Sequence, residues 1–106
     1  MSGIDDIAAE RKRQIEEEGW TPEHDDEHTS GEIAMAAIAY ASHATVGIQC
    51  PGHKPENYQS LGVPRTWPWH RGWWKPKNPR RDLVRAGALI AAEIDRLDRL
   101  SQSGAA

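Results

Sequence analysis

Phenylalanine is absent from this chain, and its 106 residues include a single cysteine. Without phenylalanine, the large side chains of the core must come from Ile, Leu and Trp, and a hydrophobic share of 38% makes that core thin. The lone Cys50 excludes an internal disulfide and is typical of a reducing compartment. Because a thin core gains stability from a bound partner, we expect a homo-oligomer.

Long hydrophobic runs and an excess of positive charge are also missing. No apolar stretch approaches the length of a membrane span, and the N-terminus lacks a signal-peptide pattern. We therefore expect a cytoplasmic protein that does not bind membranes. The net charge is -3, whereas general nucleic-acid binders carry broad positive surfaces, so binding of that kind is not expected either.

The charges that are present are separated along the chain. Residues 16–32 are mainly acidic, while residues 65–85 are rich in Lys and Arg and contain one acid, Asp82. This separation is consistent with an acidic patch for a metal ion beside a basic patch for phosphates. Two ordinary solvated faces would give the same pattern.

Three segments have helical periodicity and none has that of a strand, which predicts an all-α fold with three main helices. The first helix covers Ile4 to Glu18 and ends at Gly19. The second begins near Thr29 or Ser30 and ends at about Gly47, and its small side chains favour close approach of another helix.

The third predicted helix covers Arg80 to Leu100. Its apolar side chains recur at spacings of three and four, which makes one continuous stripe; they are Leu83, Ala86, Gly87, Ile90, Ile94 and Leu97. The three helices form a single domain over residues 1–100, and residues 101–106 form a flexible tail.

Between the second and third helices, residues 45–79 contain six of the seven prolines and no periodic pattern. Four of the five Trp residues lie in this segment, whereas disordered segments are poor in aromatic residues. We therefore predict a long, ordered loop of the kind that often carries function.

Two acids stand near the starts of the second and third helices, Glu32 and Asp82. Carboxylates on two packed helices can share a Mg²⁺ ion, and through it bind a phosphate. His24, Asp25 and His28 can add ligands suited to Mn²⁺ or Zn²⁺, although a solvated acidic turn explains the same residues.

A less favoured arrangement joins His24 and His28 with Cys50 and His53 as a tetrahedral zinc site. The chain has no second cysteine to complete a standard finger. His43 is expected to be a hydrogen-bonded packing residue, and Trp20 a core anchor.

The segment from Trp67 to Arg81 interleaves Trp with Lys and Arg. Indoles stack on nucleobases, while Lys and Arg bind phosphates, so this pattern indicates nucleotide binding. In a chain without phenylalanine, however, we expect at least two of these Trp residues to be structural. The predicted nucleotide-binding residues are Trp69, Arg71, Trp73, Trp74, Lys75, Lys77, Arg81 and Arg85.

Three stretches in the same order resemble a diverged, phage-type member of the MazG-like all-α nucleotide pyrophosphohydrolases. They are AERKRQIEEEGWTPEHDDEH, GEIAMAA and RDLVRAGALIAAEIDRLDR. The resemblance as a whole covers about two-thirds of the chain and excludes the Trp-rich loop. The resemblance implies an all-α, oligomeric fold and Mg²⁺- or Mn²⁺-dependent chemistry on nucleoside triphosphates. Glu32 and Asp82 match acids of that family, but Thr29 and Arg85 stand where two further acids are expected.

With two of four carboxylates left, we expect an accessory protein of a phage or prophage that binds a nucleotide or nucleotide-derived signal without turnover. Counter-defence by sequestering an immune messenger is one form of this function. The alternatives are an active metal-dependent pyrophosphohydrolase and a module that inhibits a host protein through its Trp residues.

Overall fold

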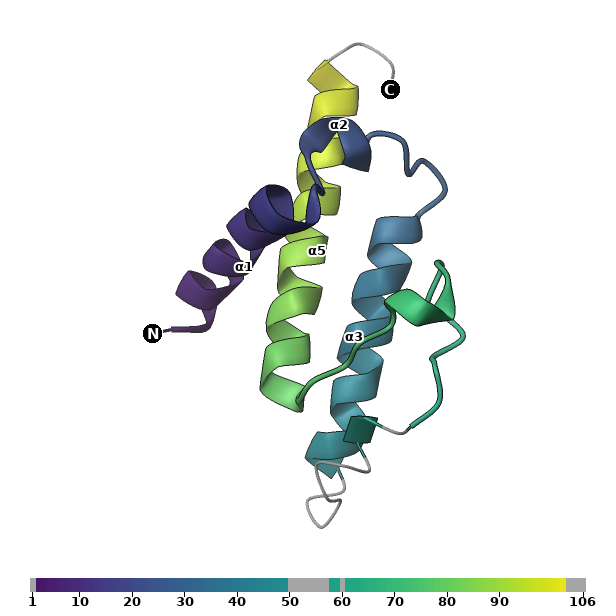
Figure 1. The fold of residues 1–106 in the computed structure, drawn as a ribbon. Helices are drawn as coiled ribbons and strands as arrows, with labels where there is room; N and C mark the ends of the chain where they lie inside the picture. Colours follow the sequence, from purple (N-terminus) through teal and green to yellow (C-terminus); the bar gives the residue numbers. More distant parts are fainter. Residues whose placement is uncertain (1, 50–57, 60, 103–106) are drawn as a thin grey trace.

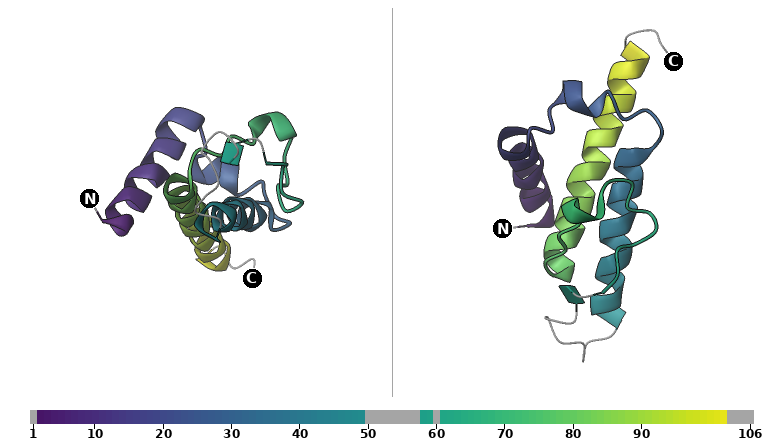
Figure 2. Two further views of the ribbon diagram at one scale, coloured as in Figure 1. Left: turned by 90° about the horizontal axis from the view of Figure 1, so that it is seen from below. Right: turned by 45° about the vertical axis from the view of Figure 1, so that its right-hand side comes forward.

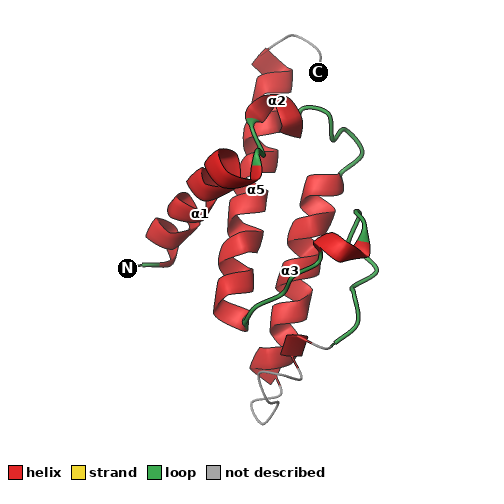
Figure 3. Cartoon of the chain, in the orientation of Figure 1, coloured by secondary structure: helices red, strands yellow, loops and turns green. Residues whose placement is uncertain are grey.

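The computed structural model describes residues 2–49, 58–59 and 61–102. All regular structure in these ranges is helical, which confirms the predicted all-α class (Figure 3). No helix in the described part is both long and apolar enough to span a bilayer. The helices in chain order are α1 (Gly3–Glu18), α2 (Pro22–Asp25), α3 (Glu32–Gln49), the 3₁₀ turn η1 (Arg71–Trp73) and α5 (Pro79–Gln102).

The first helix, α1, is defined by caps at both ends. The Ser2 side chain accepts a hydrogen bond from the Asp5 backbone N–H, and Asp5 bonds back to Ser2, as in a capping box. Gly19 ends the helix in a left-handed conformation with φ of 73°. The helix therefore begins one residue before the predicted start, and the predicted stop is confirmed.

Helices α3 and α5 form the antiparallel pair at the centre of the molecule (Figure 1). Ala36, Ala39, Ala88 and Ala92 are almost fully buried, which allows the two helices to approach closely. The predicted role of the small side chains is therefore confirmed.

The ends of α3 differ from the prediction at two glycines. Gly31 has a positive φ of 82°, so the helix begins at Glu32 and not at Thr29 or Ser30. Gly47 does not end the helix, which continues to Gln49. An added Cβ at Gly47 would lie 2.5 Å from Cγ of Pro79, so this glycine permits close packing of the start of α5.

The apolar stripe predicted on α5 does not coincide with its buried face. Leu83, Ile90, Ile94 and Leu97 are 42%, 50%, 53% and 50% exposed. Ala86 of the predicted stripe is buried, and the rest of the buried apolar side consists of Val84, Ala88, Leu89 and Ala92, which lie outside that stripe. The physical reason is that α1 and α3 both pack on α5, and their positions decide which side is covered (Figure 1).

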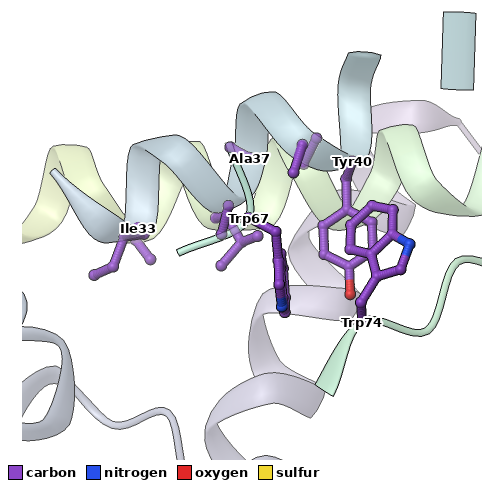
Figure 4. Packing of buried hydrophobic residues seen from close by; sticks show 10 residues of the cluster. Ile33, Ala37, Tyr40, Trp67 and Trp74 are labelled. Atoms are coloured by element: carbon purple, nitrogen blue, oxygen red, sulfur yellow. The ribbon is translucent and has the colours of Figure 1, made fainter. Parts of the chain in front are cut away.

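The Trp-rich segment packs on α3 and completes the core. Tyr40 of α3 lies between two indoles, with ring centroids 5.5 Å from Trp67 and 4.8 Å from Trp74 (Figure 4). Trp67 and Trp74 are each 8% exposed. At least two of the four Trp residues are thus structural, as predicted for a chain without phenylalanine.

Candidate functional site

A cavity of about 750 Å³ lies where the Trp-rich segment faces the end of α1 and the α2 region. Each of the four α-helices or its flanking turn, together with the loop, contributes to its wall. The lining residues are Glu17, Glu18, Trp20, His24, His28, Tyr40, Trp67, Trp69, His70, Trp73, Lys75 and Arg85. A volume of this size is typical of sites for small organic ligands.

Indole rings make up the apolar wall of the cavity. The ring of Trp69 lies 6.0 Å from Trp20 and 5.2 Å from Trp67, measured between centroids. Trp73, on the turn η1, is 70% exposed although it lines the cavity. Because the neighbouring rings hold Trp69 while Trp73 is largely free, the site combines a rigid wall with an accessible aromatic face.

The basic side of the cavity consists of Lys75 and Arg85. Arg85 Nη1 donates to the backbone carbonyl of Lys75 at 2.6 Å, and its guanidinium carbon lies 5.6 Å from the centre of the Tyr40 ring. Within the described residues, the side-chain hydrogen bonds of Arg85 all use Nη1, so Nε and Nη2 remain for a ligand. The exposed Lys75 side chain lines the same cavity.

Two histidines from the α2 region meet at the opposite side of the site. The rings of His24 and His28 lie 5.0 Å apart in an edge-to-face arrangement, and the His28 ring lies 5.3 Å from Trp69. His28 Nδ1 is 3.4 Å from Glu32 Oε2, and its buried Nε2 has no hydrogen-bond partner among the described atoms. The pair therefore offers polar ring nitrogens beside an aromatic wall.

A short helix, which carries His24, and the turn that follows it bring these two histidines together. One expectation for the acidic segment is a solvated turn, but the structure places α2 there. Thr21 caps the helix by accepting from the His24 backbone N–H, and Pro22 takes its first position. Arg99 of α5 then donates to Asp26 at 2.8 Å and to the Pro22 carbonyl at 3.2 Å, which holds α2 against the last helix.

Asp82 lies in a buried structural bond network and not in an open metal site. Its carboxylate is 0% exposed and accepts from the Tyr58 hydroxyl at 2.6 Å and from the Lys77 backbone N–H at 3.1 Å. Arg85 completes the set with an ion pair to the same carboxylate at 3.4 Å. Asp82 thereby holds the end of the Trp-rich segment to α5.

Glu32 lies at the other end of the helix pair. It opens α3, whereas Asp82 opens α5, and the helices are antiparallel (Figure 1). Since Gly47 packs near Pro79, Glu32 is about 22 Å from that end along α3. Hydrogen bonds from its own backbone N–H and that of Ser30 lower the pKa of Glu32. The structure therefore does not bring Glu32 and Asp82 together within one chain.

Asp25 is not available as a ligand either. It is 4% exposed, and its carboxylate accepts from Arg11 Nη2 at 2.8 Å. Burial raises the pKa of Asp25, and the Arg11 charge opposes that shift. This ion pair joins α1 to α2, so the role of Asp25 is structural.

The remaining residues that we predicted to bind a nucleotide or a metal ion lie in the core, on the surface, or outside the described residues. Trp74 belongs to the core, and Arg81 forms an ion pair with the buried Glu10. Arg71 and Lys77 are exposed and do not line the cavity. Cys50 and His53 lie outside the described residues, and the described ones contain no group of three or more His, Cys, Asp or Glu side chains placed to hold a metal.

Sequence reasoning missed half of the residues that line the cavity. In the sequence, Glu17 and Glu18 are typical of the solvated end of a helix, and Glu18 does form an ion pair with the Arg13 guanidinium at 2.8 Å. His24 and His28 were predicted, but as metal ligands, and the pattern Thr21-Pro22, a cap followed by a proline at the first position, is the signal that would have revealed the helix α2 beside them. The other missed residues are Trp20, Tyr40, Trp67 and His70.

The buried Tyr40 predicts a loss of stability in alkali. Burial raises its pKa from 10.0 to about 12, with the Arg85 charge opposing the shift. The hydroxyl therefore contributes its full stability below about pH 10, and this contribution is lost as the pH rises from 10 through 12. A shift of this size corresponds to about 3 kcal/mol.

Urea unfolding at about pH 9 and about pH 12 measures this effect. In Tyr40→Phe, which keeps the ring and has no ionisable group, the pH-dependent loss should shrink by about that amount. A variant with the same alkaline loss as the unmodified chain would show that Tyr40 is not responsible.

Comparison of the chain with models of protein families, with curated proteins and with solved structures found no match.

Proposed function

We propose that the protein binds a nucleotide or nucleotide-derived anion in the Trp-walled cavity and does not turn it over. The observation that carries this proposal is the position of Lys75 and Arg85 in the same cavity as Trp69 and Trp73. Cationic and aromatic side chains in one cavity suit a ligand with both phosphates and a flat base.

The chemistry of each side supports this ligand class. Stacking of a base on an aromatic side chain contributes about 1–3 kcal/mol, and the exposed face of Trp73 is accessible for it. Arg85 is held by Asp82 and by the Lys75 carbonyl, so its free nitrogens are oriented before the ligand arrives. A prepositioned guanidinium loses little entropy on binding a phosphate.

The positions of the acids favour binding over hydrolysis. A pyrophosphohydrolase uses carboxylates to hold metal ions around the phosphates. Glu32 and Asp82 lie at opposite ends of the antiparallel α3–α5 pair, and Asp82 is fully buried. Phosphates would then be bound directly by Lys75 and Arg85, so we expect binding to persist when EDTA removes divalent cations.

A matched pair of lysines tests the proposal. Lys75 and Lys77 are both exposed and two residues apart, but only Lys75 lines the cavity. The unmodified chain, Lys75→Gln and Lys77→Gln are titrated with nucleoside mono-, di- and triphosphates and cyclic dinucleotides, and Trp fluorescence is followed. Cyclic dinucleotides belong in the panel because a counter-defence protein would sequester a signal of that kind.

We expect Lys75→Gln to weaken binding at least tenfold, the value of one charged hydrogen bond of about 1.5 kcal/mol. Lys77→Gln should bind like the unmodified chain, and chromatography should recover the nucleotide intact. Release of pyrophosphate would favour the hydrolase instead. No response to any nucleotide would favour a protein-interaction module and contradict nucleotide binding.

A further inference from the structure

The exposed apolar stripe of α5 remains without a role in the single chain. Leu83, Ile90, Ile94 and Leu97 are each exposed by 42% to 53%. Successive residues of a helix are separated by about 100°, so these four side chains lie within about one quarter of the helix surface. The stripe runs for about 21 Å along the axis, from Leu83 to Leu97.

This stripe lies on the side of α5 away from the cavity. Arg85 follows Leu83 by two residues and so projects about 200° from it, and Arg85 lines the cavity. Helix α1 and the Trp-rich segment lie on one side of the α3–α5 pair, and among the described elements none covers the other side (Figure 2). A partner on the stripe would leave the cavity open.

We propose that a second copy of the chain packs on this stripe, with the two α5 helices antiparallel and Ile90 near the two-fold axis. The spacing of the stripe is self-complementary about Ile90. Leu83 precedes it by seven residues and Leu97 follows it by seven, so an axis at Ile90 places Leu83 of one chain against Leu97 of the other.

Orientation and size agree with this arrangement. Antiparallel helices bring the N-terminal end of each dipole beside the C-terminal end of the other, which is the favourable alignment. A specific interface needs on the order of 1,000 Å² of total buried surface. Each helix of 24 residues presents four half-exposed aliphatic side chains, and the stems of the flanking charged residues would supply the remaining contact surface.

Sedimentation of the full chain tests whether the exposed apolar stripe of α5 is a dimer interface. We expect the unmodified protein at about 100 µM to have twice the chain mass of 11.8 kDa. Ile90→Glu should sediment as a single chain with an unchanged helical circular dichroism spectrum, because a half-exposed side chain tolerates a charge within one chain. Trp73→Glu, an exposed apolar side chain at the cavity, is the matched control and should remain dimeric.

Cross-linking tests the orientation and does not depend on a disruptive substitution. In a Cys50→Ser background, Ile90→Cys should form a covalent dimer on mild oxidation, because residues at the axis approach within disulfide distance. Leu83→Cys alone should not, whereas mixing it with Leu97→Cys should. A monomeric unmodified chain, a dimeric Ile90→Glu, or a Leu83→Cys that cross-links to itself would overturn the proposal.

Discussion

Asp82→Ala is expected to lower the free energy of unfolding by about 3–5 kcal/mol, the usual cost of removing one partner from a buried charged network. The carboxylate is 0% exposed and accepts from the Tyr58 hydroxyl and from the Lys77 backbone N–H. Alanine would leave both donors buried without an acceptor and the Arg85 guanidinium without its counter-charge. Because a small domain has about 5–15 kcal/mol in total, this loss would be severe.

Urea unfolding with Asp98→Ala as control measures this effect. Asp98 is an exposed acid on the same helix, so its removal should change stability by no more than about 0.5 kcal/mol. In a chain that still folds, Asp82→Ala should also weaken nucleotide binding, since it releases Arg85. If the two variants had equal midpoints, Asp82 would not be holding the Trp-rich segment to α5.

Trp67→Ala should have the second large effect, a loss of about 3–5 kcal/mol in the free energy of unfolding. The indole is 8% exposed and packs edge-on against Tyr40, Trp69 and Trp74. Its Nε1 donates to the His70 carbonyl at 3.1 Å. Alanine would remove all of these contacts and leave a cavity at the junction of α3 and the loop.

Trp73→Ala is the matched comparison, since it removes the same side chain from a site that is 70% exposed. Its stability should change by less than about 0.5 kcal/mol, while nucleotide binding should weaken by the value of one stacked base, about 1–3 kcal/mol. Thermal unfolding and the fluorescence titration separate the two quantities. A loss of stability in Trp73→Ala equal to that in Trp67→Ala would contradict the division into core and ligand-facing Trp residues.

Local chemistry was sufficient to predict the three long helices. Ser2, Gly19 and the apolar periodicity specify α1 and α5 through interactions within one or two turns, and the structure confirms both. The absence of phenylalanine likewise led to the correct expectation that Trp residues enter the core. His43 is buried and its Nε2 lies 2.9 Å from the Tyr58 carbonyl, as expected of a hydrogen-bonded packing residue.

Tertiary structure alone decided which of these residues meet. Glu32 and Asp82 occupy equivalent positions at the starts of two helices, but the antiparallel pairing of α3 and α5 separates them by most of a helix length. The sequence also did not show which side of α5 is buried. Its apolar stripe and its alanine-rich side are both compatible with burial, and the packing of α1 and α3 decides between them. Distances between helices depend on long-range packing, which no local pattern records. For that reason the sequence by itself determined the three long helices and the supply of Trp, Lys and Arg. The packed structure decided that Lys75, Arg85 and Trp73 line one cavity and that Asp82 does not.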